Sequence, residues 1–161
     1  MATPQAQAVE ASLMLASDRG GDLTDAVYAR LFARHPAMQA EFWRDKNGAI
    51  RGEMLARVFD AILDLCGPAA WAPAYLETEA VTHDAYGIPR DIFTNFFAVI
   101  GDTVAATLGP DWTPDMAAGW AWLDATARTA MAPAVEDNDA RIAALIAERP
   151  DRGPQPGHPH R

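Results

Sequence analysis

Cysteine and clustered basic residues are scarce in this chain of 161 residues. Its single cysteine, Cys66, excludes an intrachain disulfide and a cysteine-based zinc site, and it fits a reducing compartment. The formal net charge is −9, and no block of lysine or arginine is present that could follow a phosphate backbone. Nucleic acid and anionic membrane surfaces are therefore poor partners for this protein.

Long apolar runs are also missing. No stretch approaches the roughly 18 uninterrupted apolar residues that a membrane span needs. Residues 1–7 lack the basic segment followed by an apolar one that marks a secretory signal. No segment alternates convincingly between apolar and polar residues, so strands are not expected. These absences predict a cytoplasmic protein with no membrane attachment.

Apolar residues instead recur at helical spacing along most of the chain. Thr3-Pro4 and Thr113-Pro114 each combine an N-cap residue with a first-turn proline, and so predict helix starts. The most apolar helix is expected from Pro89 to Leu108, and the last long helix is expected to be kinked or interrupted near Pro133. We predict one all-α domain of six to eight helices over residues 1–148, followed by a flexible Pro/Gly-rich tail over residues 149–161.

His83 stands where one helical run ends, just before the next begins at Pro89. A histidine at such a place can be a helix-end residue that caps carbonyl groups. The residues after it (an aromatic, a glycine, a branched aliphatic and a proline) instead favour an imidazole held over a cavity while the chain reverses. Imidazole is the commonest protein ligand for a transition metal, haem iron included.

Three groups of residues extend this interpretation. The segment 27–36 carries Tyr28 and leaves its helix through Pro36, Phe42 closes the short turn that follows, and His83 precedes the corner that ends at Pro89. In this order on an all-helical background, they resemble the globin family, specifically bacterial single-domain haemoglobins and the haem domain of flavohaemoglobins. The resemblance covers residues 8–137 and implies a globin-like fold around a haem pocket.

The resemblance implies haem b as cofactor and His83 as its axial ligand, with the other ring N–H donated to the backbone carbonyl of Glu79. On the opposite face of the haem, where a gas would bind, the resemblance places Arg51, with Gly52 as the alternative. The carboxylate that flavohaemoglobins place beside this histidine would come from Glu136 or Asp137. The expected haem contacts are Phe42, Arg51, Leu55, Tyr86, Ile88 and Phe93, of which Phe93 replaces a tyrosine of flavohaemoglobins.

Tyr28 is expected to put its hydroxyl over the iron, although a core tyrosine with a polar tip is the ordinary alternative. The implied function is reversible binding of oxygen, nitric oxide or carbon monoxide. Nitric oxide detoxification would also need an external reductase, so enzyme activity stays open. The alternatives are a gas- or haem-responsive sensor or interaction module, and a haem-free globin scaffold, which the unusual Glu79 keeps open. Both a monomer and a homodimer agree with the sequence.

Overall fold

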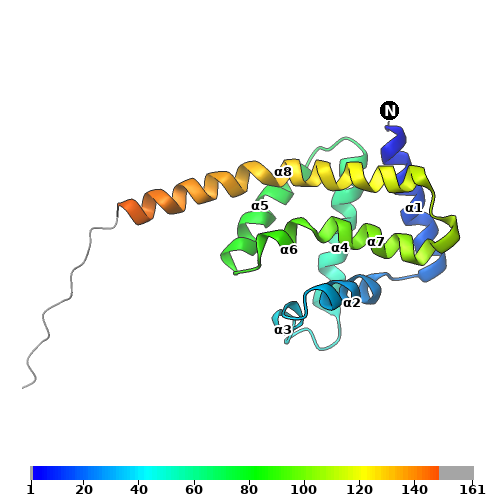
Figure 1. The fold of residues 1–161 in the computed structure, drawn as a ribbon, viewed down its shortest axis with the longest axis horizontal. Coiled ribbons are helices and arrows are strands. Elements are labelled where there is room, and N and C mark those ends of the chain that lie inside the picture. The colour runs from blue at the N-terminus through cyan, green and yellow to red at the C-terminus, as the bar shows by residue number, and fades with distance from the viewer. Residues whose placement is uncertain (1, 149–161) are drawn as a thin grey trace, which may run out of the picture.

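The computed structural model describes residues 2–148, and within them the chain is helical, with no strand (Figure 1). The expected tail over residues 149–161 lies outside this range. The elements are α1 (Pro4–Gly20), α2 (Thr24–Arg34), α3 (Met38–Glu41), α4 (Ala49–Cys66), α5 (Ala72–Ala85), α6 (Arg90–Thr94), α7 (Phe96–Leu108), the 3-10 turn η1 (Gly109–Asp111) and α8 (Pro114–Ala147). The all-α prediction is confirmed.

Both predicted helix starts at a Thr-Pro pair are present. The Thr3 hydroxyl accepts a hydrogen bond from the backbone N–H of Ala6 at 3.2 Å, and the Thr113 hydroxyl accepts one from Met116 at 3.2 Å. Each bond satisfies an N–H group that the first helical turn leaves without a partner. These two ends depend on neighbouring residues alone, which is why the sequence predicts them well.

Two helices differ from the expected boundaries. The helix expected from Pro89 to Leu108 is divided at Asn95 into α6 and α7, and the Asn95 side chain accepts a hydrogen bond from Arg128 of α8. Conversely, α8 continues through Pro133 to Ala147 as one helix. Contacts with another helix thus accompany the first break, while the proline that breaks helices in general does not end this one.

α8 packs against α1 and α7 at one end of the molecule (Figure 1). The indole N–H of Trp120 donates to the hydroxyl of Ser12 at 2.8 Å, and both side chains are buried. Glycines allow these helices to approach closely: a methyl group at Gly119 would lie 2.7 Å from the backbone oxygen of Gln5, and one at Gly101 would lie 2.9 Å from the ring of Trp120. The core where α1, α7 and α8 meet is therefore tightly packed.

The start of α5 is held by a buried carboxylate at the end of α4. Asp64 accepts hydrogen bonds from the backbone N–H groups of Ala70, Trp71 and Ala72 at 3.2, 3.0 and 2.8 Å. Burial alone would raise the pKa of Asp64, but these three donors together lower it by more than burial raises it. The pKa of Asp64 therefore lies below its ordinary value. The ionised group therefore fixes the direction in which α5 leaves α4.

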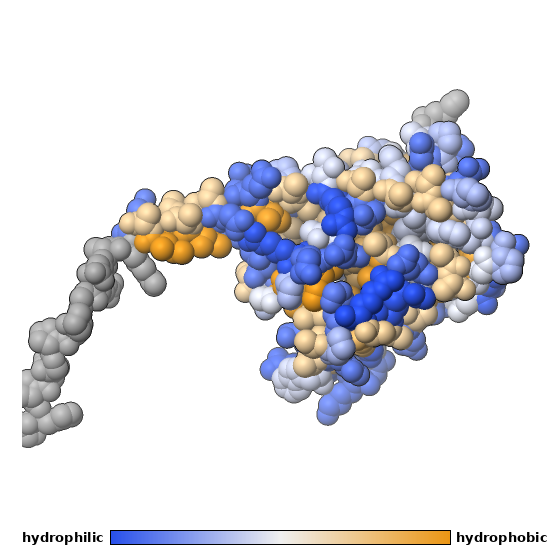
Figure 2. Space-filling model, viewed as in Figure 1, coloured by the Kyte–Doolittle hydropathy of each residue, from blue (hydrophilic) through white to orange (hydrophobic). Residues whose placement is uncertain are grey.

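The second half of α8 extends beyond the helical body (Figure 1). Ile142, Leu145 and Ile146 are exposed there, and Figure 2 shows a hydrophobic band at the end of this helix. Within residues 2–148, no helix has both the length and the apolar character to span a bilayer.

The close approach of α1 and α8 generates a stability prediction. Gly119→Ala should lower the free energy of unfolding by about 1–3 kcal/mol, because the added methyl group meets backbone that cannot move aside cheaply. Gly52→Ala is the matched control: its methyl group would meet nothing within 4 Å, so it should stabilise α4 by roughly 0.5–1 kcal/mol. Urea unfolding of both variants tests this, and equal shifts in the same direction would contradict it.

Candidate functional site

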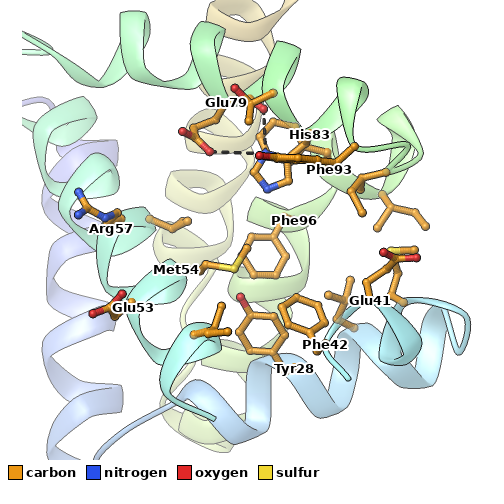
Figure 3. Close-up of a pocket in the computed structure, with 18 of the residues that line it drawn as sticks. Tyr28, Glu41, Phe42, Glu53, Met54, Arg57, Glu79, His83, Phe93 and Phe96 are labelled. Atoms are coloured by element: carbon orange, nitrogen blue, oxygen red, sulfur yellow. Dashed lines mark hydrogen bonds and ion pairs between the residues drawn. The ribbon is translucent and has the colours of Figure 1, made fainter. Parts of the chain in front are cut away.

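A cavity of about 760 Å³ lies between α2, α3, α4, α5, α6 and α7 (Figure 3). This volume is within the range of about 300–1,000 Å³ that small-molecule and cofactor sites occupy. Its wall is largely aromatic and aliphatic, formed by Tyr28, Leu31, Met38, Phe42, Met54, Val58, Leu76, Ile88, Ile92, Phe93, Phe96 and Phe97. The cavity therefore suits a large, mostly apolar ligand.

His83 lies near the end of α5 and lines this cavity. Its Nδ1 is 2.8 Å from the backbone oxygen of Glu79, one turn earlier, as the sequence predicts. With Nδ1–H as the donor, Nε2 keeps its lone pair, and Figure 3 shows the ring directed from α5 into the cavity. The ring of Phe93 stacks beside it with centroids 4.4 Å apart. The imidazole is thus held in one tautomer and one orientation.

A carboxylate also lies beside this imidazole, but it comes from an unexpected residue. Oε2 of Glu79 is 3.5 Å from Nδ1 of His83, and Glu79 lines the cavity. Glu136 and Asp137, the expected sources, are exposed residues of α8 and do not line the cavity. The expectation fails because the distance between α8 and α5 is a tertiary property, whereas residues four apart on one helix meet locally.

Tyr28 lies across the cavity from His83 (Figure 3). Its side chain is buried, and its hydroxyl has no hydrogen-bond partner within residues 2–148. Burial raises the pKa of Tyr28, so the phenol stays neutral and remains a hydrogen-bond donor. The ring is held by Phe42 and Phe96, with centroids 5.3 and 5.8 Å away. An unpaired buried donor that faces a cavity is the arrangement that a ligand would complete.

The residues expected on α4 do not form the cavity wall. Arg51 instead binds Asp45, with Nε 2.8 Å from Oδ2, and Leu55 is buried in the core. Gly52, the alternative to Arg51, is also off the wall. Ile50, Met54 and Val58 are the α4 residues of the apolar wall. The register is set where Asp45 accepts hydrogen bonds from the N–H groups of Ile50 and Arg51, both at 3.0 Å.

The other expected contacts do lie on the wall, to different depths. Phe42, Ile88 and Phe93 are partly buried there, whereas Tyr86 is 78% exposed and touches only the rim. Sequence reasoning did not find Met54, Tyr75 or Arg57. For Met54 and Arg57 the sequence does hold a signal, because helical spacing puts them on one face with Ile50 and Val58.

Charged side chains surround the opening. Glu41, Arg44, Glu53 and Arg57 line the cavity and are exposed. Burial raises the pKa of Tyr75, and the negative charge of Glu79 raises it further. The two arginines are available to the acidic groups of a ligand whose apolar body lies deeper.

An ionic network connects the end of α5 with α8. The guanidinium of Arg90 binds Asp84, at 2.8 Å, and Asp139, at 2.6 Å, while the amide of Asn138 donates to Asp84 at 3.2 Å. Hydrogen bonds from Arg90 lower the pKa values of both Asp84 and Asp139. Because Asp84 directly follows His83, the network ties α8 to the backbone beside the imidazole.

Comparison with protein families agrees with this geometry. The model described as Globin matches residues 25–131, well over half of the chain. The matched span starts in α2 and ends in α8, and it contains both Tyr28 and His83. A search of curated proteins finds no match.

The unpaired hydroxyl of Tyr28 generates a prediction for the ligand-free protein. Tyr28→Phe should raise the free energy of unfolding by about 1 kcal/mol, because it removes a buried donor that has no partner. Tyr75→Phe is the control. Tyr75 lines the same cavity, but its hydroxyl is not among the buried polar groups that lack a hydrogen-bond partner. Chemical unfolding measures both, and a destabilised Tyr28→Phe would mean that the hydroxyl already has a binding partner.

Proposed function

The chain belongs to the globin family, and we propose that it binds haem b through His83 and uses it to bind a diatomic gas reversibly. Globins bind haem as a family, and the residues of this cavity fit that group. One observation carries the proposal: Nδ1 of His83 is committed to the Glu79 carbonyl at 2.8 Å, which leaves Nε2 for a metal inside a cavity of about 760 Å³.

When bound, haem supplies an iron atom that can combine with oxygen, nitric oxide or carbon monoxide. The protein's part is to orient, shield and stabilise. The Glu79 carbonyl holds the imidazole, and the apolar rings of Phe42 and Phe96 line the cavity beside Tyr28. The Tyr28 hydroxyl would donate its unused hydrogen bond to a polar gas ligand. Arg44 and Arg57, which line the opening, would hold the propionates.

The domain that would hold the haem extends beyond the matched span. We assign residues 1–148 to it, beyond both ends of the matched span 25–131. Support comes from α1, which precedes the span and packs on α8, α7 and α4, with Ser12 bonded to Trp120. Consumption of nitric oxide would need electrons from an external reductase, so we propose reversible gas binding for this chain by itself.

The test is an absorption spectrum of the protein with added haemin, then with dithionite and carbon monoxide. We expect a sharp Soret band that shifts when carbon monoxide is added, and loss of haem retention in His83→Ala, because that variant lacks the imidazole. His35→Ala is the control, since His35 does not line the cavity. Circular dichroism checks that both variants fold. Stable haem binding by His83→Ala would refute the assignment.

A haem-responsive interaction module is a second candidate function, and α8 is the observation that favours it. The helix extends beyond the body and exposes Ile142, Leu145 and Ile146 (Figure 2). Through Arg90, its Asp139 is bound to Asp84, the residue after His83. A change at the imidazole therefore has a direct ionic connection to the extended half of α8.

Hydrogen exchange tests this candidate. Haem loading should slow amide exchange in the second half of α8, because a fixed Asp84 holds Arg90 and thereby Asp139. Asp139→Asn should remove that slowing, whereas Asp137→Asn, which changes an exposed carboxylate of the same helix, should not. If haem loading leaves the amide exchange rates of α8 unchanged in every variant, gas binding remains the sole candidate function.

A further inference from the structure

Met54 occupies a distinctive place in the cavity. It belongs to the face of α4 that also carries Ile50 and Val58, and all three residues line the wall. Figure 3 shows the thioether of Met54 directed into the cavity, between His83 above and Tyr28 below. The side chain that α4 offers to a ligand opposite the imidazole is therefore a methionine, where the sequence pattern suggests Arg51 or Gly52.

The chemistry of the other wall residues favours a thioether as the second ligand. Two methionines line the wall, Met38 and Met54, and Met54 is the one that Figure 3 shows between His83 and Tyr28. Among the described residues, no histidine other than His83 lines the cavity. Tyr28 is a buried neutral phenol, which is a poor ligand for ferrous iron. Glu41 and Glu53 are exposed at the opening. A thioether is a soft donor that pairs with histidine in cytochromes c, and methionine has three rotatable bonds with which to approach a metal or withdraw.

We propose that Met54 is a second, displaceable axial ligand of the haem iron, on the face opposite His83. The inference rests on the proposed haem binding at His83. It implies that the resting ferrous protein is six-coordinate and that a gas must displace the thioether. The iron–sulfur bond breaks as the iron–gas bond forms, and the sulfur leaves as a neutral two-electron donor, so neither a proton nor an electron is transferred.

This ligation changes how the protein responds to a gas. Only the fraction of molecules with Met54 detached can bind, so the apparent affinity falls by that fraction. If Met54 is attached in about nine-tenths of the molecules, the apparent affinity for carbon monoxide is about tenfold weaker than that of the open form. At high carbon monoxide concentration, the observed binding rate reaches a plateau set by detachment of the thioether.

The experiment uses the full chain loaded with haem and reduced with dithionite. It compares the unchanged protein with Met54→Leu and with Met38→Leu, a control that removes another methionine from the same cavity wall. Methionine and leucine have similar volumes, so both variants should retain the packing. The readouts are the ferrous absorption spectrum without gas, the dependence of the binding rate on carbon monoxide concentration, and proton NMR of the ferrous protein.

We expect low-spin six-coordinate bands, a rate plateau and a methionine methyl resonance shifted strongly by the haem ring current in the unchanged protein and in Met38→Leu. In Met54→Leu the bands and the shifted methyl signal should be lost, and the rate should rise linearly with carbon monoxide. A Soret band with a five-coordinate ferrous spectrum in the unchanged protein would overturn the role of Met54 but leave haem binding at His83 standing.

Two further results would also overturn the role of Met54. Loss of the low-spin bands in Tyr28→Phe but not in Met54→Leu would assign the sixth ligand to the phenol. Complete absence of a Soret band would overturn both haem binding and this inference. If Met54→Leu does not fold, the shifted methyl resonance still decides the question: its persistence in Met38→Leu supports Met54 as the ligand, and its loss there assigns the ligand to Met38.

Discussion

An apolar cavity of about 760 Å³ has to stay open inside a small helical protein. Protein interiors are normally close-packed, so a wall without external support would collapse inward. Here the support lies outside the cavity: Asp64 fixes the start of α5, Asp45 fixes the start of α4, and α8 packs tightly on α1 at Gly119. The shape of the cavity therefore depends on this frame.

Away from the charged opening, His83 and Tyr28 are the polar groups on which the chemistry of this cavity depends. The imidazole of His83 is oriented by its own helix, through the Glu79 carbonyl and carboxylate. Opposite it, Tyr28 is neutral because burial raises its pKa, and its hydroxyl has no partner. The thioether of Met54 lies between them in Figure 3. A donor, an acceptor and a soft ligand thus meet in a largely apolar space, where each interaction is strong.

α8 gives the molecule a feature that the cavity does not require. Its first half closes the core through Trp120, whereas its second half leaves the body and carries exposed aliphatic side chains. The ionic network of Arg90 joins this second half to the residue that follows His83. Communication between the cavity and an outside partner would therefore pass through the bonds that Arg90 and Asn138 make with Asp84.

The sequence by itself determined the features that depend on neighbours along the chain. These are the all-α class, the two Thr-Pro helix starts, and the bond from His83 to the carbonyl four residues earlier. Only the tertiary structure decided which side of α4 faces the cavity. Met54 and Val58 lie on the wall, where the sequence pattern suggests Arg51 and Leu55. It also decided that Glu79, not a residue of α8, supplies the carboxylate. The reason is physical: helical periodicity defines faces, but the rotation of a helix about its axis is set by long-range contacts.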